Sequence, residues 1–438
     1  MKGQKANGRD ADAPNVDKQS ADPKNLDGHS VDGPDAGAES ASPRNVGGQG
    51  VDGGDAGTES TNPQSVDARN VEGQNVGGRE AGAEGADPQS ADGQSVEGQS
   101  ARVGGVAVGR VFRRVAGTGT FWIGVVLVVL YLAFSIARPD AFPTRFTFQT
   151  LLIETAVLLV LSIGMTFVIV TAGIDLSVGM VLIFSGVLAS KTMEWLSPGE
   201  DATHAGWGLI LLGLLVSLAG GAVWGLVNGF LVAKAKIPPL IVTLGSFGAA
   251  LGSAQLITGG VDTRTVPEKL RNSLGFGTVL GGIPDLVLVA AVVTLFGAWL
   301  LHTTRFGRYT YAIGSNAEAA RRAGIGVTRH LVLVYLMAGM LSGLAGFMNL
   351  AYFGTTTIAG HGTDNLDAIA GVVIGGTSLF GGVGSVLGTV IGVFIPSVLR
   401  KGFVIVGVPV FWQPIAVSVV LVAAVWFDQI RRRSRDRK

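Results

Sequence analysis

The stretch TLLIETAVLLVLSIGMTFVIVT, residues 150–171, decides the fold of this 438-residue chain. Its one ionisable residue is Glu154, near its start. The run is as long as a helix must be to cross a bilayer core of roughly 30 Å. Soluble core helices are rarely so long and so uniformly apolar, so the stretch predicts a membrane-spanning helix.

Similar runs follow one another on both sides of this stretch. The predicted spans are residues 121–137, 150–171, 176–195, 207–233, 239–258, 285–302, 331–353, 366–379, 384–399 and 411–427. They predict an all-α polytopic membrane protein with about ten transmembrane helices. The eighth and ninth runs are short and joined by GGTSLFGGVGS (375–385), so a re-entrant or broken pair is an open alternative.

The residues before the first span have a different composition. Residues 1–100 contain no Phe, Trp, Tyr or Ile and one Leu, with about 18 acidic against about 8 basic residues. Such a segment cannot bury enough apolar surface to offset the entropy of folding. We therefore expect residues 1–109 to be a disordered, acidic, low-complexity arm. The transmembrane domain is predicted at 110–430, and a basic tail at 431–438.

Basic residues set the expected orientation, because they accumulate on the cytoplasmic side of membrane proteins. Clusters precede the first span, follow the fourth, fill the loop 304–329 and close the chain as RRRSRDRK. An even number of spans places all four on the cytoplasmic face together with both termini. Exceptions such as Arg264, Arg400 and Lys401 then lie at the outer face.

Small residues recur every fourth position on three predicted spans. The sets are Gly221, Gly225 and Gly229; Ala338, Ser342 and Gly346; and Gly384, Gly388 and Gly392. Such stripes permit close approach of helix backbones, although membrane helices are also generally rich in glycine. No function follows from them alone.

Polar residues within the spans are candidates for a solute path, since hydrocarbon penalises them unless they face a partner or water. The candidates are Asp175, Ser177, Asn228, Thr243, Ser246 and Asn349. Asp175 and Ser177 have a second interpretation as caps of the third span. Carboxylates are scarce in the spans, which argues against ion-coupled secondary transport and suits a neutral hydroxylated solute. TAGIDLSVG and IGGTSLFGGVG form a weak echo between the two halves, consistent with an inverted repeat or with chance.

Several chemistries are excluded or disfavoured by missing residues. No Gly-Lys-Ser/Thr phosphate loop is present, so the chain has no ATP site of that type and is not predicted to be an enzyme. Cysteine is absent and the five histidines are scattered, so we expect no metal site and no cofactor in this chain. Nothing predicts a nucleic-acid partner.

Five phrases in order resemble a known family. They are TAGIDLSVGM (171–180), IPPLIVTLGSFGAALG (237–252), ITGG (257–260), TRFGRYTYAIGSNAEAARRAGI (304–325) and LDAIAGVVIGGTSLFGGVGSVLGTVIG (366–392). Together the phrases resemble the ribose-type permease subunits of bacterial ABC importers for monosaccharides, within the branched-chain amino acid/ribose permease superfamily. The resemblance covers about residues 120–430; the acidic arm lies outside it.

The resemblance implies a function and a set of partners. Glu318, Ala319, Ala320, Arg321 and Gly324 match the cytoplasmic coupling helix that docks on an ATPase subunit, with Gly324 ending the helix in a left-handed cap. It further implies a second permease subunit, identical or different, two ATP-binding subunits that hold ATP and Mg, and an extracytoplasmic sugar-binding protein. The expected location is the bacterial cell membrane. The expected function is import of a pentose, hexose or polyol by alternating access.

Other functions stay open at this point. The nearest is an ABC permease for branched-chain amino acids or nucleosides. An ion-coupled secondary transporter would lose uptake with the ion gradient, and a membrane scaffold acting through the acidic arm would depend on residues 1–100. The solute itself cannot be read from this chain.

Overall fold

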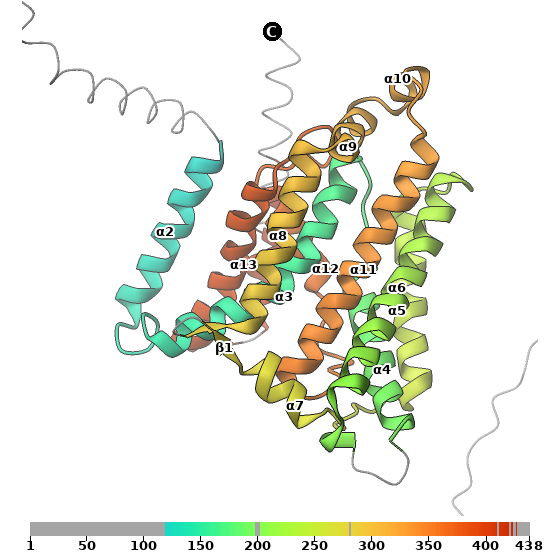
Figure 1. Ribbon diagram of the computed structural model, residues 1–438. Coiled ribbons are helices and arrows are strands. Elements are labelled where there is room, and N and C mark those ends of the chain that lie inside the picture. The colour runs from blue at the N-terminus through green and yellow to red at the C-terminus, as the bar shows by residue number, and fades with distance from the viewer. Residues whose placement is uncertain are drawn as a thin grey trace, which may run out of the picture. The chain divides into compact units, whose positions relative to one another are not determined.

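The computed structural model describes residues 119–197, 202–279, 282–409, 411–419, 422, 423 and 426 (Figure 1). The predicted acidic arm (1–109) and basic tail (431–438) lie outside these residues, so the predictions about them remain predictions. The predicted tenth span (411–427) is described only in part.

The described chain is helical apart from one two-residue antiparallel pairing, β1 with β2. The elements in order are α2 (Gly119–Ala137), α3 (Arg145–Val170), α4 (Val178–Trp195), η1 (Ala202–His204), α5 (Trp207–Ala233), α6 (Pro239–Thr258), α7 (Glu268–Leu270), η2 (Arg271–Gly275), β1 (Thr278–Val279), β2 (Ile283–Pro284), α8 (Asp285–Thr303), α9 (Arg305–Ser315), α10 (Ala317–Arg322), α11 (Val327–Phe353), α12 (Asp364–Ile374) and α13 (Val386–Val406).

Eight of the described helices are long and apolar enough to cross a membrane. They are α2, α3, α4, α5, α6, α8, α11 and α13. The all-α polytopic membrane fold is therefore confirmed. The eighth predicted span is corrected: α12 has 11 residues, about 16 Å of helix, too short to cross. The chain continues from it as the irregular segment 375–385, so the broken form is the one that the structure adopts.

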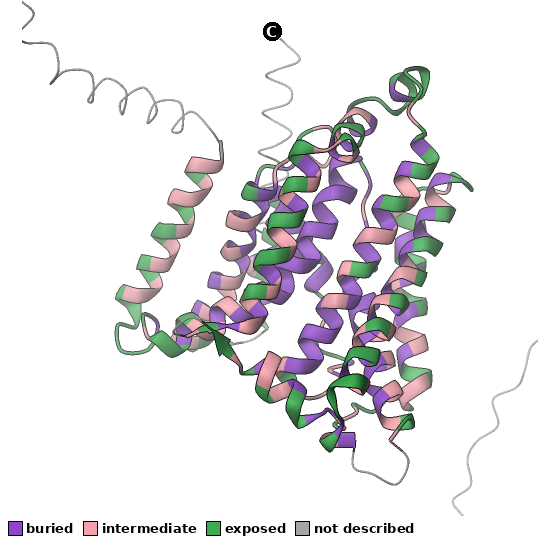
Figure 2. Ribbon diagram, viewed as in Figure 1, coloured by how far each residue is buried: buried purple, intermediate pink, exposed green. Residues whose placement is uncertain are grey.

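Helix α3 is the core of the bundle. It begins where Thr144 accepts a hydrogen bond from the Thr147 N–H, five residues before the predicted start, and it packs against α8, α11, α12 and α13. Of its most apolar 18 residues, 94% are buried, whereas the same measure for the peripheral α2 is 0%. Figure 2 shows this contrast between α3 and α2. Helix α2 rests mainly on α13, with Phe134 packed against Phe142 and Phe403.

Helices α5 and α11 pack antiparallel with their backbones in contact. A Cβ at Gly221 would meet the Gly339 carbonyl, and one at Gly225 would meet the Tyr335 carbonyl. The contact works in both directions, since a Cβ at Gly339 would meet the Gly221 carbonyl. The glycine stripe of α5 is therefore used for close helix approach.

The two irregular segments named in the sequence meet each other inside the bundle. Residues 171–177 connect α3 to α4, and residues 375–385 connect α12 to α13. Gly382 N–H donates to the Val170 carbonyl at 2.9 Å, and Ala172 takes a left-handed φ of 62° beside Gly381. The segment before α4 also touches the first turn of α12, because the Asn365 amide donates to the Leu176 carbonyl at 3.1 Å. The inverted repeat itself remains a prediction.

The bundle has two ends of different character (Figure 1). One end carries α9 and α10, and the antiparallel packing of α5 and α11 brings Lys234 and Lys236 to that end as well. The other end carries α7, η2 and the β1–β2 pairing. The predicted cytoplasmic basic clusters that are described thus gather at the α9–α10 end.

Candidate functional site

Helix α10 projects from one end of the bundle with most of its surface exposed. Its N-cap is Asn316, whose side chain accepts from the Ala319 N–H at 2.9 Å. Glu318 pairs within the helix with Arg321 at 2.8 Å and Arg322 at 3.6 Å. Ala320 faces inward and is buried, packing near Ile313 and Val327. The Glu318, Arg321 and Arg322 side chains are left on the outer surface.

Gly324 ends α10 in the conformation that the sequence predicts. Its φ is +83°, the Ile325 N–H donates back to the Ala320 carbonyl, and the Gly324 N–H donates to Arg321. The bond from Ile325 spans six residues, which is the Schellman pattern of helix termination. The short helix is thus closed at both ends by its own sequence.

Gly324→Ala should loosen this helix end. A Cβ there meets nothing within 4 Å, so the cost is that of a left-handed alanine alone, about 1–2 kcal/mol. We expect tryptic cleavage after Arg322 in the folded protein to rise about fivefold to thirtyfold. Gly324→Asn is the matched control, since asparagine tolerates this conformation, and it should cleave at nearly the wild-type rate. Equal cleavage of both variants would contradict the prediction.

Helix α9 joins α10 to the two irregular segments. The Tyr311 hydroxyl donates to the Gly384 carbonyl at 2.7 Å, and Gly314 lies against Val170 and Gly382. Burial raises the pKa of the Tyr311 phenol, so it keeps its proton and remains a donor. The Thr310 hydroxyl is bonded to the His330 ring on α11 at 2.9 Å. Helix α9 thus links α10 to the end of α3 and to the segment 375–385, which lies between α12 and α13.

Five of the six candidate path residues form one buried cluster, which we call the α4-entry cluster: Asp175, Ser177, Asn228, Thr243 and Ser246. The Asp175 carboxylate accepts from the Ser177 N–H at 2.9 Å and from its hydroxyl at 2.6 Å. The Asn228 amide donates to the Ser177 hydroxyl and accepts from Ser246. Thr243 donates to the Pro239 carbonyl on its own helix. Asp175, Ser177, Asn228 and Ser246 satisfy one another, so the cluster ties the start of α4 to α5 and α6.

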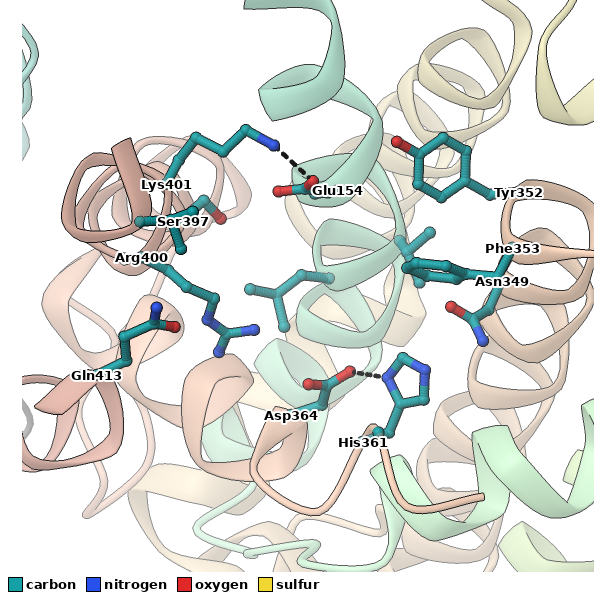
Figure 3. Close-up of a pocket in the computed structure, with 14 residues that line it drawn as sticks. Glu154, Asn349, Tyr352, Phe353, His361, Asp364, Ser397, Arg400, Lys401 and Gln413 are labelled. Carbon is teal, nitrogen blue, oxygen red and sulfur yellow. Dashed lines mark hydrogen bonds and ion pairs between the residues drawn. The ribbon is translucent and has the colours of Figure 1, made fainter. Parts of the chain in front are cut away.

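The sixth candidate, Asn349, lies elsewhere, in a polar pocket at the end opposite α10 (Figure 3). The pocket has a volume of about 400 Å³ and lies between α3, α11, α12 and α13. Ion pairs of Lys401 with Glu154 at 2.7 Å and of Arg400 with Asp367 lie at its walls, and the His361 ring is hydrogen-bonded to the Asp364 carboxylate at 2.6 Å. Tyr352 and Phe353 supply aromatic rings beside Asn349.

Comparison with known proteins agrees with this architecture. Residues 147–425 match the family model described as "Branched-chain amino acid transport system / permease component". The chain belongs to this permease family. It is 36% identical to the ribose import permease of Escherichia coli K12 over 308 residues, which is 69% of this chain and 92% of the relative.

Two further relatives of the permease are similar in extent. The fructose import permease of Rhizobium meliloti is 32% identical over 70% of this chain and 85% of its own length. The xylose transport system permease of Haemophilus influenzae is 32% identical over 70% of this chain and 96% of its own length. No solved structure matches the chain.

The sequence identified the polar residues of the permease better than it identified their grouping. Periodicity did not show that Asn349 is separated from the α4-entry cluster. Arg400 and Lys401 stood only as exceptions to the charge rule, and His361 and Gln413 were not singled out. The signal for this pocket was the presence of basic residues, Arg400 and Lys401, at one end of a predicted span and of the acidic Glu154 near the start of another.

Asn228→Ala should destabilise the permease through the α4-entry cluster. The substitution leaves the buried Ser177 and Ser246 hydroxyls short of a partner, at a cost of about 1–3 kcal/mol. We expect a melting temperature several degrees below wild type in detergent. Gln255→Ala removes an exposed amide from α6 and serves as the control, with little change expected. Equal melting temperatures for the two variants would contradict the role given to the cluster.

Proposed function

We propose that this chain is the membrane-spanning subunit of an ATP-driven ABC importer that carries a monosaccharide into the cytoplasm. The observation that carries the proposal is the set of sugar permeases to which the chain is similar. Relatives named for ribose, fructose and xylose transport share 32–36% identity with it across 85–96% of their own lengths. A pentose, a hexose or a related polyol is the corresponding class of solute.

The energy for transport comes from a separate subunit in this proposal. The chain has no phosphate-binding loop, so ATP and Mg are held by ATP-binding partners. Helix α10 is the proposed docking element, because it is exposed, rigidly capped and joined through α9 to the interior. Its basic surroundings favour the cytoplasmic side, with both termini on that side. A second permease subunit and an extracytoplasmic sugar-binding protein complete the importer.

The polar pocket favours a neutral solute over an amino acid. An amino acid brings a carboxylate and an ammonium group, and each needs an opposite charge when it leaves water. The charged side chains on the pocket wall are already paired with one another, as Glu154 with Lys401 and Arg400 with Asp367. A sugar needs only hydrogen-bonding groups, which the pocket also offers.

The mechanism that follows is alternating access. ATP binding draws the two ATPase subunits together, and each α10 moves with the subunit on which it is docked. Through Tyr311 and Gly314 of α9, that movement reaches the segments 171–177 and 375–385, which precede α4 and α13. A shift of these segments repositions α4 and α12 around the solute path, as discontinuous helices do in other transporters. No covalent chemistry occurs in this chain.

Sugar uptake in the native cell tests the proposal. Cells that lack the gene should fail to accumulate one of labelled D-ribose, D-xylose or D-fructose, and the intact gene should restore accumulation. Depletion of ATP should abolish uptake while an ionophore leaves it unchanged. Uptake that survives ATP depletion and disappears with the ion gradient would replace the proposal with secondary transport.

A further inference from the structure

We propose that the polar pocket between α3, α11, α12 and α13 is a binding site within the permease for a neutral, polyhydroxylated solute. The inference rests on the proposed function and deepens it, because it places solute recognition in this chain as well as in a binding protein. Four properties of the pocket carry it: its unpartnered polar atoms, its paired charges, its aromatic wall and its position.

The pocket presents one unpartnered acceptor and one unpartnered donor. Asn349 is 5% exposed and Gln413 is 8% exposed. Among the residues that the structure describes, Asn349 Oδ1 and Gln413 Nε2 have no hydrogen-bond partner. The Asn349 amide nitrogen is held by the Thr357 hydroxyl at 3.2 Å, which fixes the side chain with its oxygen unused. Buried polar atoms rarely go unpartnered, so this acceptor and donor call for a ligand or water.

A sugar hydroxyl matches this pair of atoms, because it donates one hydrogen bond and accepts others. A cation would be served by the Asn349 oxygen alone, and an anion by the Gln413 nitrogen alone. The hydroxyls of one sugar ring offer donors and acceptors on several sides of the molecule, so a single solute can serve both atoms. The unused atoms therefore select for a molecule with several neutral donor–acceptor groups.

The charged side chains of the pocket also favour a neutral solute, because they are already paired with one another. Lys401 is held by Glu154 and His361 by Asp364 (Figure 3), and Arg400 is paired with Asp367. An ionic solute would have to break one of these pairs and leave a partner uncompensated, which is costly at a partly buried site. A neutral solute can accept or donate at their outer edges without breaking them.

Size and wall composition fit the same class of ligand. A volume of about 400 Å³ lies within the roughly 300–1,000 Å³ that small-molecule sites occupy. Tyr352 and Phe353, with ring centroids 5.0 Å apart, give one wall an aromatic surface for the C–H face of a sugar ring. The pocket lies at the end opposite α10, which is the outer end in the orientation that the proposed function requires.

The absence of cysteine permits a direct test on the full-length protein in its importer. Ser397→Cys places a single thiol on the pocket wall, where the native hydroxyl bonds only to its own helix at Val393. Labelling by a membrane-impermeant thiol reagent is followed in right-side-out vesicles with D-ribose, D-xylose or D-fructose. At a sugar concentration of twice Kd, labelling should slow about threefold, by the factor 1 + [L]/Kd. Ser273→Cys, half-buried at the same end but outside the pocket, is the matched control and should label at an unchanged rate.

A second substitution assigns the protection to the unpartnered atoms. Asn349→Ala or Gln413→Ala, added to Ser397→Cys, should remove the protection. Thr155→Val, which deletes an unpartnered buried hydroxyl outside the pocket, should retain it. Leucine serves as a further probe because it carries an ammonium group and a carboxylate, and protection by leucine instead of a sugar would overturn the assignment of solute class.

The labelling experiment and the uptake experiment can fail independently, because labelling requires neither ATP nor transport. Protection by a sugar without ATP-driven uptake would leave the pocket assignment standing and remove the importer mechanism. Uptake without protection by any of the three sugars would overturn the pocket assignment. A Ser397→Cys variant that the external reagent cannot label would overturn it as well.

Discussion

Glu318→Lys should lower sugar uptake by about tenfold or more, equivalent to at least about 1.4 kcal/mol of lost coupling. In the proposed docking, the exposed face of α10 meets the ATPase subunit, and Glu318 supplies the acidic group of that face. Reversal of its charge adds a third positive side chain beside Arg321 and Arg322. The new charge repels a partner surface that is complementary to the native one.

The fold of the permease should tolerate the same change. The Glu318 side chain is 58% exposed, and exposed ion pairs contribute only about 0–1 kcal/mol to stability. We therefore expect a nearly unchanged melting temperature and normal insertion, with ATP hydrolysis uncoupled from uptake. Measurement of both ATPase activity and labelled-sugar accumulation distinguishes uncoupling from loss of protein.

Glu268→Lys is the matched control for this charge reversal. Glu268 is an exposed acidic residue on α7, at the end of the bundle opposite α10. Its variant has the same change in net charge and should transport at close to the wild-type rate. Normal ATP-driven uptake in Glu318→Lys would remove α10 as the docking element.

Gly221→Ala should prevent stable assembly of the bundle. The added methyl would overlap the Gly339 carbonyl and lie 2.9 Å from the Gly343 nitrogen, and both belong to the backbone of α11. Backbone cannot move aside as a flexible side chain can, so α5 and α11 must separate. Overpacking of this kind costs about 1–3 kcal/mol and sometimes more. We expect little folded protein by size-exclusion chromatography in detergent.

The same substitution is expected to have the opposite effect on stability at a glycine that is not packed against another helix. Alanine is favoured over glycine within a helix by roughly 0.5–1 kcal/mol, so an open position should gain stability from the same substitution. Gly245 on α6 is such a position, because a Cβ added there would meet nothing within 4 Å. Gly245→Ala should melt at or above the wild-type temperature. Equal stability of the two variants would show that the α5–α11 contact is looser than described.

The sequence predicts the long helices well and the irregular segments poorly. The predicted spans 207–233 and 239–258 coincide with α5 and α6, because Pro239 begins α6 and Gly259, with φ +66°, ends it. The apolar run from residue 366 to 379 is misleading, since Gly375 and Gly376 end α12 after 11 residues despite the apolar residues beyond them. Hydropathy measures transfer to the membrane and does not register where a helix stops inside it.

The polar residues show a second limit of prediction from the sequence. Asn228 and Asn349 are both amides in apolar helices, and nothing in their local sequence separates a structural amide from one that faces a pocket. Asn228 is satisfied by Ser177 and Ser246 from two other helices, whereas Asn349 keeps an unused oxygen. That difference arises from contacts between helices far apart in the chain. The residues that surround Asn349 could therefore be identified only from the structure.

The bond from Gly382 N–H to the Val170 carbonyl has a consequence for how this protein can be studied and how it can vary. Both atoms belong to the main chain, so exchange of the Val170 side chain leaves the link intact. A scan by alanine substitution across residues 171–177 would report on side chains such as Asp175 and pass over this connection. Its weak points are glycines instead: Gly382 has a φ of +73°, and a Cβ at Gly314 would meet both the Val170 carbonyl and the Gly382 nitrogen. The tie between the two segments therefore tolerates exchange of the Val170 side chain but not the addition of a methyl group at either glycine.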